Sequence, residues 1–362
     1  MDNKSKQPKK RVLYADPVCY GNHYSYNYNN IRILSRLCDL SLFVKEQYID
    51  DNTLKLKDLF LWNKKYCWDN IPHKTRISYF VRTSHAFLHN LKQILSLAKK
   101  NKYDLVIISC VNITLLSLAT RFTRRENIAF VDHGIYLSLT RKYVMQSWRF
   151  LNKRLKVCAL ESYFVPYLKQ EMKIKNKIYL LKHPLNFGSV SRIQPKNKNG
   201  LLLFAPSSSN PISFALELKD NTSDIPDGIK IVCKGNFDYE DSKLLVYSGK
   251  LPREKYDAYF HYADGIIVPY DSNYNYRTSG VLFDSIVNKK PVILKKGNTL
   301  EYYSNKNPEI FYVYDCFDKL LDILNKMKVA QGNQLSFDKF LNEYGDDELA
   351  KEFVDLLEDK PL

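Results

Sequence analysis

The sequence lacks any apolar run long enough to cross a bilayer. No window approaches about 18 uncharged apolar residues, so we expect no transmembrane helix. The basic residues near the start are followed by neither an apolar segment nor a cleavage site, which argues against a secretory signal. The 12 glycines and 14 prolines are too few for a collagen-like or low-complexity chain. A repeat of fixed short period is also missing, which argues against a solenoid.

Metal-binding and disulfide patterns are absent as well. The seven cysteines are scattered, and none forms a CxxC pair or a Cys/His cluster at metal-ligand spacing. We therefore expect buried thiols in a reducing cytoplasm rather than a disulfide framework. The cysteines are Cys19, Cys38, Cys67, Cys110, Cys158, Cys233 and Cys316.

Positive charge is what the chain has in excess. With 55 Lys and Arg against 39 Asp and Glu, the formal net charge is +16. Such a field favours polyanions: nucleic acid, an anionic membrane leaflet or phosphorylated small molecules. The abundant lysine, asparagine, isoleucine and tyrosine also fit an AT-rich genome, which is a second explanation of the charge. Nucleic acid is disfavoured, because the basic residues are dispersed and no zinc-finger, RRM or recognition-helix pattern is present.

The length and the 45% hydrophobic content predict two domains, each with its own core. In the first half, β-type runs alternate with helical segments, which is typical of a parallel sheet. Residues 50–80 lack a clear period and predict a surface insertion, followed by a helix over 84–100; an earlier helix is expected over 30–37. The expected strands are KRVLYA (10–15), LSLFVK (40–45), YDLVIISC (103–110), IAFVDHGI (128–135), VCAL (157–160) and IYLLKHP (178–184).

The second half repeats this alternation, from LLLFAP (201–206) to KPVILK (290–295). Between the halves, a polar stretch with Gly and Pro predicts a linker. We expect an α/β protein of two Rossmann-like domains whose parallel sheets face a central cleft. Its predicted parts are an N-terminal domain (1–187), the linker (188–199), a C-terminal domain (200–335) and C-terminal helices (336–362) that can cross back to the first domain.

The stretch VPYDSNYNYRTSGVLFDSIVNKKPVIL carries the strongest signal for a ligand. Ligands of open parallel sheets bind beyond the carboxyl ends of the strands, and here a strand end leads through a polar loop into a helix. Thr278 and Ser279 suit a helix cap, and Gly280 lets a ligand approach the backbone N–H groups. Arg277 adds a planar fork of donors that suits a diphosphate. The alternative is an ordinary helix start with a solvated Arg277.

Residues 247–294, YSGKLPREKYDAYFHYADGIIVPYDSNYNYRTSGVLFDSIVNKKPVIL, resemble the donor half of GT-B glycosyltransferases, especially glycosyltransferase family 4 and its relatives. The shared pattern is a Gly-containing turn, a helix, a strand ending in Pro-Tyr, a loop, a second helix and a strand at Pro-Val-Ile. The first half resembles the family more loosely, through IAFVDHGI and IYLLKHPLN. The resemblance implies a GT-B fold, with a nucleotide-sugar donor on the second domain and an acceptor on the first.

The resemblance also implies roles for donor-site residues. Asp284 stands where the family has its second glutamate, which holds the ribose; alternatively, it is an acid favoured by the helix dipole. Tyr276 occupies the place of the first glutamate, which lies near the donor sugar, so the motif does not secure retention of configuration. The Arg and Lys that clamp the diphosphate in the family are missing from FAPSSSNPIS, so other residues must take their role. The donor-binding candidates are Arg277, Thr278, Ser279, Gly280, Asp284, Lys250, Arg253, Tyr276, Ser208 and Asn210.

Catalytic candidates come from the first half. His133 is similar to the family's histidine that touches the donor sugar, and a structural or solvated histidine is the alternative. Asp132 would accept the proton of the acceptor hydroxyl if the reaction inverts, and Asp16 is a further candidate. His23 and Tyr24, in an aromatic-rich stretch, are candidates for acceptor binding. Because no Asp-x-Asp follows a strand, we expect neither a metal ion nor a permanently bound cofactor, with cations and helix amides stabilising the leaving diphosphate.

The sequence therefore predicts a glycosyltransferase of bacterial surface polysaccharide or glycan synthesis. We expect it in the cytoplasm or as a peripheral protein at the inner face of the plasma membrane, acting on a saccharide or polyprenyl-linked acceptor. Three alternatives stay open: a two-Rossmann nucleotide-sugar epimerase, a non-catalytic nucleotide-sugar binder, which the tyrosine at position 276 favours, and a nucleic-acid-binding protein.

Overall fold

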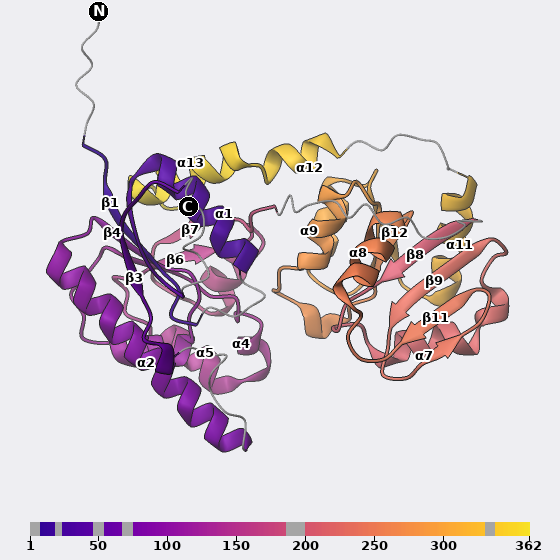
Figure 1. Cartoon of the computed structure of the whole chain (residues 1–362), viewed down its shortest axis with the longest axis horizontal. Coiled ribbons are helices and arrows are strands. Elements are labelled where there is room, and N and C mark those ends of the chain that lie inside the picture. Colours follow the sequence, from indigo (N-terminus) through magenta and orange to yellow (C-terminus); the bar gives the residue numbers. More distant parts are fainter. Residues whose placement is uncertain (1–7, 19–23, 46–53, 67–74, 186–199, 330–336) are drawn as a thin grey trace, which may run out of the picture. The chain divides into compact units, whose positions relative to one another are not determined.

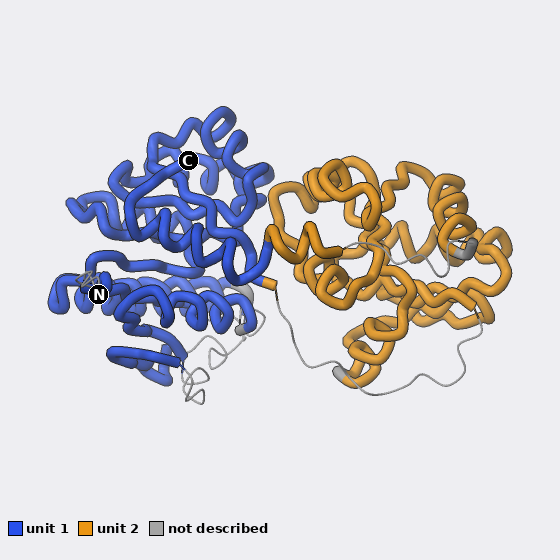
Figure 2. Tube along the Cα trace, turned by 90° about the horizontal axis from the view of Figure 1, so that it is seen from above, with its two compact units in different colours: residues 1–184, 344–362 blue, residues 185–343 orange. Residues whose placement is uncertain are grey.

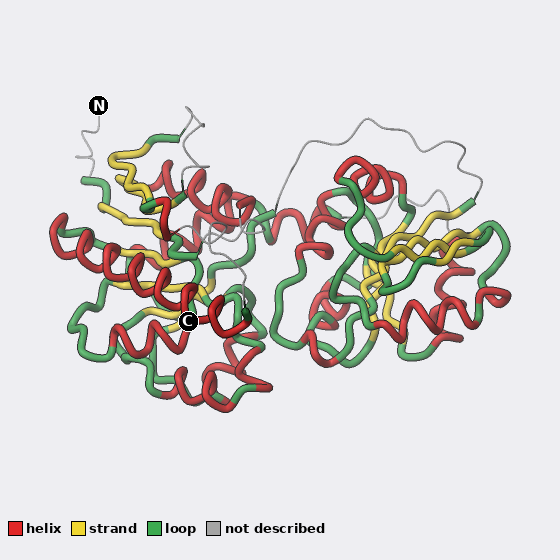
Figure 3. The backbone as a smooth tube through the Cα atoms, turned by 60° about the horizontal axis from the view of Figure 1, so that its bottom comes forward, coloured by secondary structure: helices red, strands yellow, loops and turns green. Residues whose placement is uncertain are grey.

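The computed structural model divides the chain into two compact units (Figure 2). Unit 1 comprises Met1–Pro184 together with Tyr344–Leu362, and unit 2 comprises Leu185–Glu343. Within each unit, helices lie on both sides of a sheet (Figure 3). The predicted linker 188–199 lies outside the described residues. The structure describes residues 8–18, 24–45, 54–66, 75–185, 200–329 and 337–362.

Unit 1 is built on a sheet with seven described strands, in the order β3-β2-β1-β4-β5-β6-β7. All of these pairs are parallel. The central strands are continuous apolar runs because helices cover both faces; β4 and β5 are buried at every position. The strand order reverses between β1 and β4, which is where such sheets bind ligands. The strands are β1 (Arg11–Ala15), β2 (Asp39–Val44), β3 (Leu56–Leu61), β4 (Leu105–Ile108), β5 (Ile128–Val131), β6 (Lys156–Ala159) and β7 (Ile178–Leu180).

The helices of unit 1 connect successive strands and cover the sheet (Figure 1). Two of them carry clear N-caps: Thr75 Oγ1 accepts the Ser78 N–H at the start of α2, and Asn112 Oδ1 accepts the Leu115 N–H at the start of α3. The helical segments are α1 (Tyr24–Leu37), η3 (Lys64–Tyr66), α2 (Arg76–Asn101), α3 (Ile113–Thr120), α4 (Leu137–Thr140), α5 (Lys142–Arg149), α6 (Phe164–Pro166), η5 (Tyr167–Glu171) and α13 (Asp346–Leu357).

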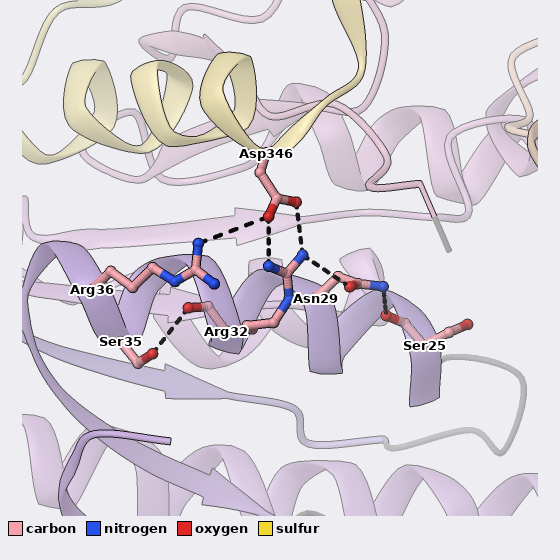
Figure 4. Close-up of polar contacts among 6 residues, drawn as sticks. All are labelled: Ser25, Asn29, Arg32, Ser35, Arg36 and Asp346. Carbon is pink, nitrogen blue, oxygen red and sulfur yellow. Dashed lines mark hydrogen bonds and ion pairs between the residues drawn. The ribbon is translucent and has the colours of Figure 1, made fainter. Parts of the chain in front are cut away.

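The C-terminal helix α13 packs on unit 1, although it follows unit 2 in the chain. Arg32 on α1 donates to both carboxylate oxygens of Asp346, at 2.5 and 2.7 Å (Figure 4). Lys182, after β7, pairs with Glu352: its Nζ lies 3.4 Å from Oε1, and its backbone N–H donates to Oε2 at 2.8 Å. These pairs attach α13 to unit 1 at two points: the first residue of the helix binds α1, and its middle binds the segment after β7.

The parallel strands of unit 2 repeat the order of the first six strands of unit 1. Its described sheet has the order β10-β11-β9-β8-β12-β13-β14, and its strand order reverses between β8 and β12. All pairs are parallel except β10 with β11, an antiparallel hairpin at one edge. The strands are β8 (Leu201–Ala205), β9 (Ile229–Lys234), β10 (Tyr239–Glu240), β11 (Leu244–Tyr247), β12 (Gly265–Val268), β13 (Val292–Lys295) and β14 (Phe311–Tyr314).

The core of unit 2 forms where inward-facing strand residues meet the covering helices. Leu203, Ile231 and Ile267 from three neighbouring strands are fully buried with Phe214 of α7 and Leu324 of α11. None of the helices in the described part of the chain has the length and apolar character needed to cross a membrane. The helical segments are α7 (Ile212–Asp220), η6 (Thr222–Asp224), α8 (Arg253–Tyr262), η7 (Ser272–Tyr274), α9 (Gly280–Val287), α10 (Glu301–Lys306), α11 (Phe317–Val329) and α12 (Asp338–Glu343).

The structure confirms the two parallel α/β sheets and corrects several details. The predicted insertion 50–80 contains β3, which adds an edge strand beside β2. α1 and α2 begin at Tyr24 and Arg76, earlier than the predicted 30 and 84. Of the described cysteines, Cys316 is exposed and the others are buried, so the prediction of burial is wrong there.

Candidate functional site

In unit 2, the loops after β8 and β12 meet where the strand order reverses. Tyr270, just after β12, lies between them, because its buried side chain is close to Ser207 of the first loop and to Ser279 at the end of the second. Burial raises the pKa of Tyr270, and the neighbouring Ser207 and Ser279 side chains and the positive charge of Arg277 oppose that rise. The two loops thus form one polar surface at the carboxyl edge of the sheet.

Helix α9 begins at this surface. Ser279 is its N-cap, with Oγ accepting the Leu282 N–H at 3.2 Å, which confirms the predicted cap. Thr278 instead accepts the Tyr274 hydroxyl on its backbone carbonyl, at 3.0 Å. A Cβ placed on Gly280 would meet no atom within 4 Å. Packing therefore does not require glycine there, and the space beside the first N–H groups of α9 is open to a ligand.

Arg277 is held by aromatic side chains of its own loop. Its guanidinium carbon lies 5.2 Å from the centre of the Tyr274 ring, and that ring packs against Tyr270 with centroids 4.0 Å apart. A cation on an aromatic face keeps the plane of its guanidinium oriented. The arrangement therefore presents a positioned cation beside the start of α9.

Tyr276 adopts a left-handed backbone conformation, with φ of 54°. That region is costly for a residue with a Cβ and persists where the surroundings impose it. Here the Tyr276 N–H donates to Thr299 Oγ1 at 2.9 Å, and the Thr299 N–H donates to Asn275 Oδ1 at 2.8 Å. Asn298 adds a bond from Nδ2 to the Tyr270 carbonyl at 2.7 Å. The loop that carries Arg277 is thus fixed by hydrogen bonds to Asn298 and Thr299.

A cavity of about 540 Å³ opens at the same edge of the sheet. This volume is in the range of small-molecule sites, roughly 300–1,000 Å³. Lysines and tyrosines line it, so it offers cations for phosphates and ring faces for a base or sugar. The lining residues are Pro206, Ser208, Lys234, Tyr247, Gly249, Lys250, Leu251, Pro252 and Tyr256.

Of the remaining donor-site candidates, some line the cavity and others do not. Ser208 and Lys250 line the cavity. Asn210 does not: its Nδ2 donates to the Ala205 carbonyl at 2.8 Å, so its amide closes the turn after β8. Arg253 is the first residue of α8, next to the cavity wall, but its side chain lies outside the described part of the structure. Asp284 is half-buried in α9, about one turn after Gly280.

In unit 1, Asp16 follows β1 and is fully buried. Its Oδ1 accepts the Val18 N–H at 2.8 Å, and its Oδ2 accepts Asn27 Nδ2 at 2.5 Å. Asn27 in turn accepts the Tyr14 hydroxyl at 2.7 Å. Both oxygens of Asp16 are therefore engaged in holding the loop after β1 against α1, which gives this residue a structural task.

Asp132 follows β5 and is also buried, but its two oxygens differ. Oδ1 accepts the Gly134 N–H at 2.7 Å, whereas Oδ2 is buried without a hydrogen-bond partner among the described residues. Burial raises the pKa of Asp132 from 3.8 to about 7, and the Gly134 N–H offsets part of the rise. Gly134 permits this contact, because a Cβ there would lie 3.0 Å from Oδ1. Asp132 is thus a carboxyl group able to exchange a proton near neutral pH.

His133 lies in an aromatic cluster that sequence reasoning missed. Its ring meets Tyr26 edge-on with centroids 4.7 Å apart, and His183, after β7, lies 5.1 Å from the same tyrosine ring. The His133 Nε2 is 3.1 Å from the Ser109 carbonyl, so this nitrogen carries the proton if the contact is a hydrogen bond. Three strands and α1 are needed to bring these residues together. The only signal in the sequence was the position of both histidines after strands.

The predicted acceptor residues are described only in part. His23 lies outside the described residues, and Tyr24 is the first residue of α1, with a side chain that is not described. Within the ranges that the structure does describe, no group of three or more His, Cys, Asp or Glu residues is placed to hold a metal ion.

Comparison with solved structures identifies the fold as GT-B. A glycosyltransferase from Rickettsia africae matches 98% of this chain and 99% of its own, with a TM-score of 0.63 and 13% identity. Sucrose-phosphate synthase from Thermosynechococcus elongatus matches 97% of this chain and 99% of its own, with a TM-score of 0.66 and 10% identity. Anabaena HepE in complex with UDP matches 96% of this chain and 100% of its own, with a TM-score of 0.62 and 11% identity.

Sequence comparison adds no relative, since no family model and no curated protein matches the chain. The structural matches establish the two-domain GT-B architecture that the resemblance implied, while membership of glycosyltransferase family 4 stays a prediction.

Proposed function

We propose that this protein is a glycosyltransferase that binds a nucleoside-diphosphate sugar at the carboxyl edge of the unit 2 sheet. The observation that carries the proposal is that cationic groups and a helix start both lie along that edge: Lys234 and Lys250 line the cavity, and Arg277 and Gly280 lie at the start of α9. The GT-B fold supports the proposal. Two similar structures also support it: Anabaena HepE is in complex with UDP, and an E. coli trehalose-6-phosphate protein is bound with UDP-2-fluoro glucose.

The chemistry of the proposed donor site follows from these groups. Breaking the bond between sugar and diphosphate leaves negative charge on the diphosphate. Arg277 and the first N–H groups of α9 would receive that charge, and Lys250 would add a second cation. Tyr247 and Tyr256 would contact the base in the cavity, and Asp284 would accept hydrogen bonds from the ribose. These groups need no metal ion for their part in binding.

Unit 1 supplies the proposed acceptor side. Asp132 Oδ2 would accept the proton of the attacking hydroxyl, for which a pKa of about 7 is well matched. His133, oriented by Tyr26, would contact the donor sugar. This assignment belongs to an inverting reaction, since Tyr276 leaves no glutamate where the retaining relatives place one. The proposed acceptor is a saccharide or a polyprenyl-linked saccharide of a bacterial surface glycan.

The test is a thermal-shift panel of UDP-, GDP-, ADP- and CMP-linked sugars, followed by an assay of nucleoside diphosphate release for whichever donor stabilises the protein. We expect one class to raise the midpoint of unfolding and to be turned over with an added acceptor saccharide. Stabilisation without turnover on a broad acceptor set would favour the non-catalytic binder, and interconversion of the sugar would favour the epimerase. No stabilisation by any donor would refute the proposal.

A further inference from the structure

The first three turns of α2 expose apolar side chains that no described part of the chain covers. Ile77 is 78% exposed, Phe80 63% and Val81 58%, and Leu88 follows at 39%. At 3.6 residues per turn, Ile77, Val81 and Leu88 share one face of the helix. We call these four residues the α2 stripe.

The start of α2 stands clear of the body of unit 1. Phe80 and Phe87 are seven residues apart and lie on nearly the same face, yet Phe87 is 1% exposed and Phe80 63%. The helix is therefore packed from about Thr83 onward, while its first two turns project. Figure 1 shows this end of α2 extending beyond the rest of the unit. Exposed apolar patches of this kind mark interaction sites.

The charged residues of α2 itself all have the same sign. Helix α2, Arg76–Asn101, contains two arginines, three lysines and two histidines but no acidic residue. Lys92 continues the face of Leu88 one turn later, and Arg82 is exposed on the neighbouring flank. Segment η3 adds Lys65, because Tyr66 beside it stacks on His89 with ring centroids 3.7 Å apart.

The same positive field acts on His89. Burial lowers the pKa of His89, and the positive charges of His85, Lys92 and Lys65 lower it further. His85, Lys92 and Lys65 therefore all lie near His89, and with Arg82 they make up the basic flank of the apolar stripe.

We propose that the α2 stripe and its basic flank dock on an anionic lipid bilayer, with Ile77, Phe80 and Val81 entering the headgroup boundary and Arg82 and Lys92 contacting lipid phosphates. An exposed helix with an apolar face beside a cationic, acid-free flank is the pattern of interfacial membrane helices. A symmetric contact with a second copy is disfavoured, because it would place two acid-free basic surfaces against each other. The inference does not depend on the proposed glycosyl transfer.

The experiment is co-sedimentation of the full chain with vesicles, either of neutral phosphatidylcholine or with added phosphatidylglycerol, in the absence of nucleotide. We expect binding that increases with the phosphatidylglycerol fraction and falls with salt. The double variant Ile77→Asp/Val81→Asp should bind at least about tenfold more weakly. The matched control is Ile212→Asp/Leu216→Asp, which changes two exposed apolar residues at the same spacing on α7, and should bind as the unchanged protein does.

A second pair of variants tests the charge. Arg82→Glu/Lys92→Glu should also weaken binding to anionic vesicles about tenfold or more, whereas Lys319→Glu/Lys326→Glu, which reverses two exposed cations of α11, should not. Several outcomes would overturn the proposal: no binding to anionic vesicles, binding unchanged by the α2 substitutions, a dimer that Ile77→Asp/Val81→Asp converts to monomer, or a lowered unfolding midpoint in that variant, which would mean that the chain itself covers the stripe.

Discussion

Two glycines leave room for polar groups to approach backbone N–H groups in this protein. Gly280 leaves room beside the first N–H groups of α9, and Gly134 lets the Asp132 carboxylate approach a backbone N–H. Neither glycine has a positive φ, so neither is required by its own backbone conformation. At Gly134, the missing methyl group leaves space for the Asp132 carboxylate. At Gly280, it leaves space for the phosphate in the proposed donor site.

Gly280→Ala separates stability from binding. Because the added Cβ meets no atom within 4 Å, alanine should leave the free energy of unfolding unchanged or raise it by about 0.5 kcal/mol. The same methyl group would stand beside the N–H groups proposed to bind the diphosphate, so donor affinity should fall by roughly tenfold. Urea unfolding and calorimetric titration measure the two effects. Unchanged affinity would place the diphosphate elsewhere.

Asp132 provides a pH-dependent prediction. Its folded pKa of about 7 exceeds the ordinary 3.8, so its contribution to stability is fully present below about pH 4 and is lost as pH rises through 7. The loss is on the order of 4 kcal/mol at most. Asp132→Asn keeps the oxygen that accepts the Gly134 N–H and removes the titration. Relative to the unchanged protein, it should therefore become progressively more stable between pH 4 and pH 8 in urea unfolding.

The same variant tests the proposed catalytic role of Asp132. If its carboxylate is the base, the transfer rate should rise with pH around 7, and Asp132→Asn should lower kcat by at least about a hundredfold. If Asp132→Asn gains the expected stability but keeps its kcat, Asp132 is a buried titrating group that takes no part in the reaction.

Among the structural elements, the sequence best predicts those whose conformation depends on residues adjacent in the chain. The Ser279 cap and the predicted strands follow from neighbouring residues. The first turns of α2 were missed because their apolar residues face outward and give no buried period. The left-handed backbone at Tyr276 was hidden because Thr299, 23 residues away, imposes it. The contact of Tyr26 with His133 and His183 was hidden for the same reason, since it depends on how β5, β7 and α1 are arranged.

Helix α13 is the element whose attachment is most open to test. Only 11% of each side chain in the Lys182–Glu352 pair is exposed, so Glu352→Ala should remove the ion-pair partner of a largely buried lysine. We expect a loss of about 3 kcal/mol in the free energy of unfolding. Glu358, the C-cap of the same helix, pairs with Lys360 at the surface, so Glu358→Ala should cause no measurable change. Equal effects in urea unfolding would contradict this account of how α13 is held.

At the scale of the whole molecule, the two sheets share the order of six parallel strands but carry different chemistry at their carboxyl edges. Unit 2 gathers Lys234, Lys250 and Arg277 there, whereas unit 1 gathers Asp132 and His133. Cations suit the phosphates of a donor, and a carboxyl with a pKa near 7 suits a proton acceptor. The net charge of +16 favours binding of the donor's phosphates, since it raises the local concentration of anionic ligands.

The most direct test of the donor site is calorimetric titration of the stabilising nucleotide sugar into three proteins: the unchanged chain, Arg277→Ala and Lys326→Ala. The control removes an exposed cation from α11 and keeps the net charge equal to that of the test variant. We predict that Kd rises at least about tenfold for Arg277→Ala and stays unchanged for Lys326→Ala. Equal Kd values for Arg277→Ala and the unchanged protein would contradict the central claim that unit 2 binds the diphosphate at the start of α9.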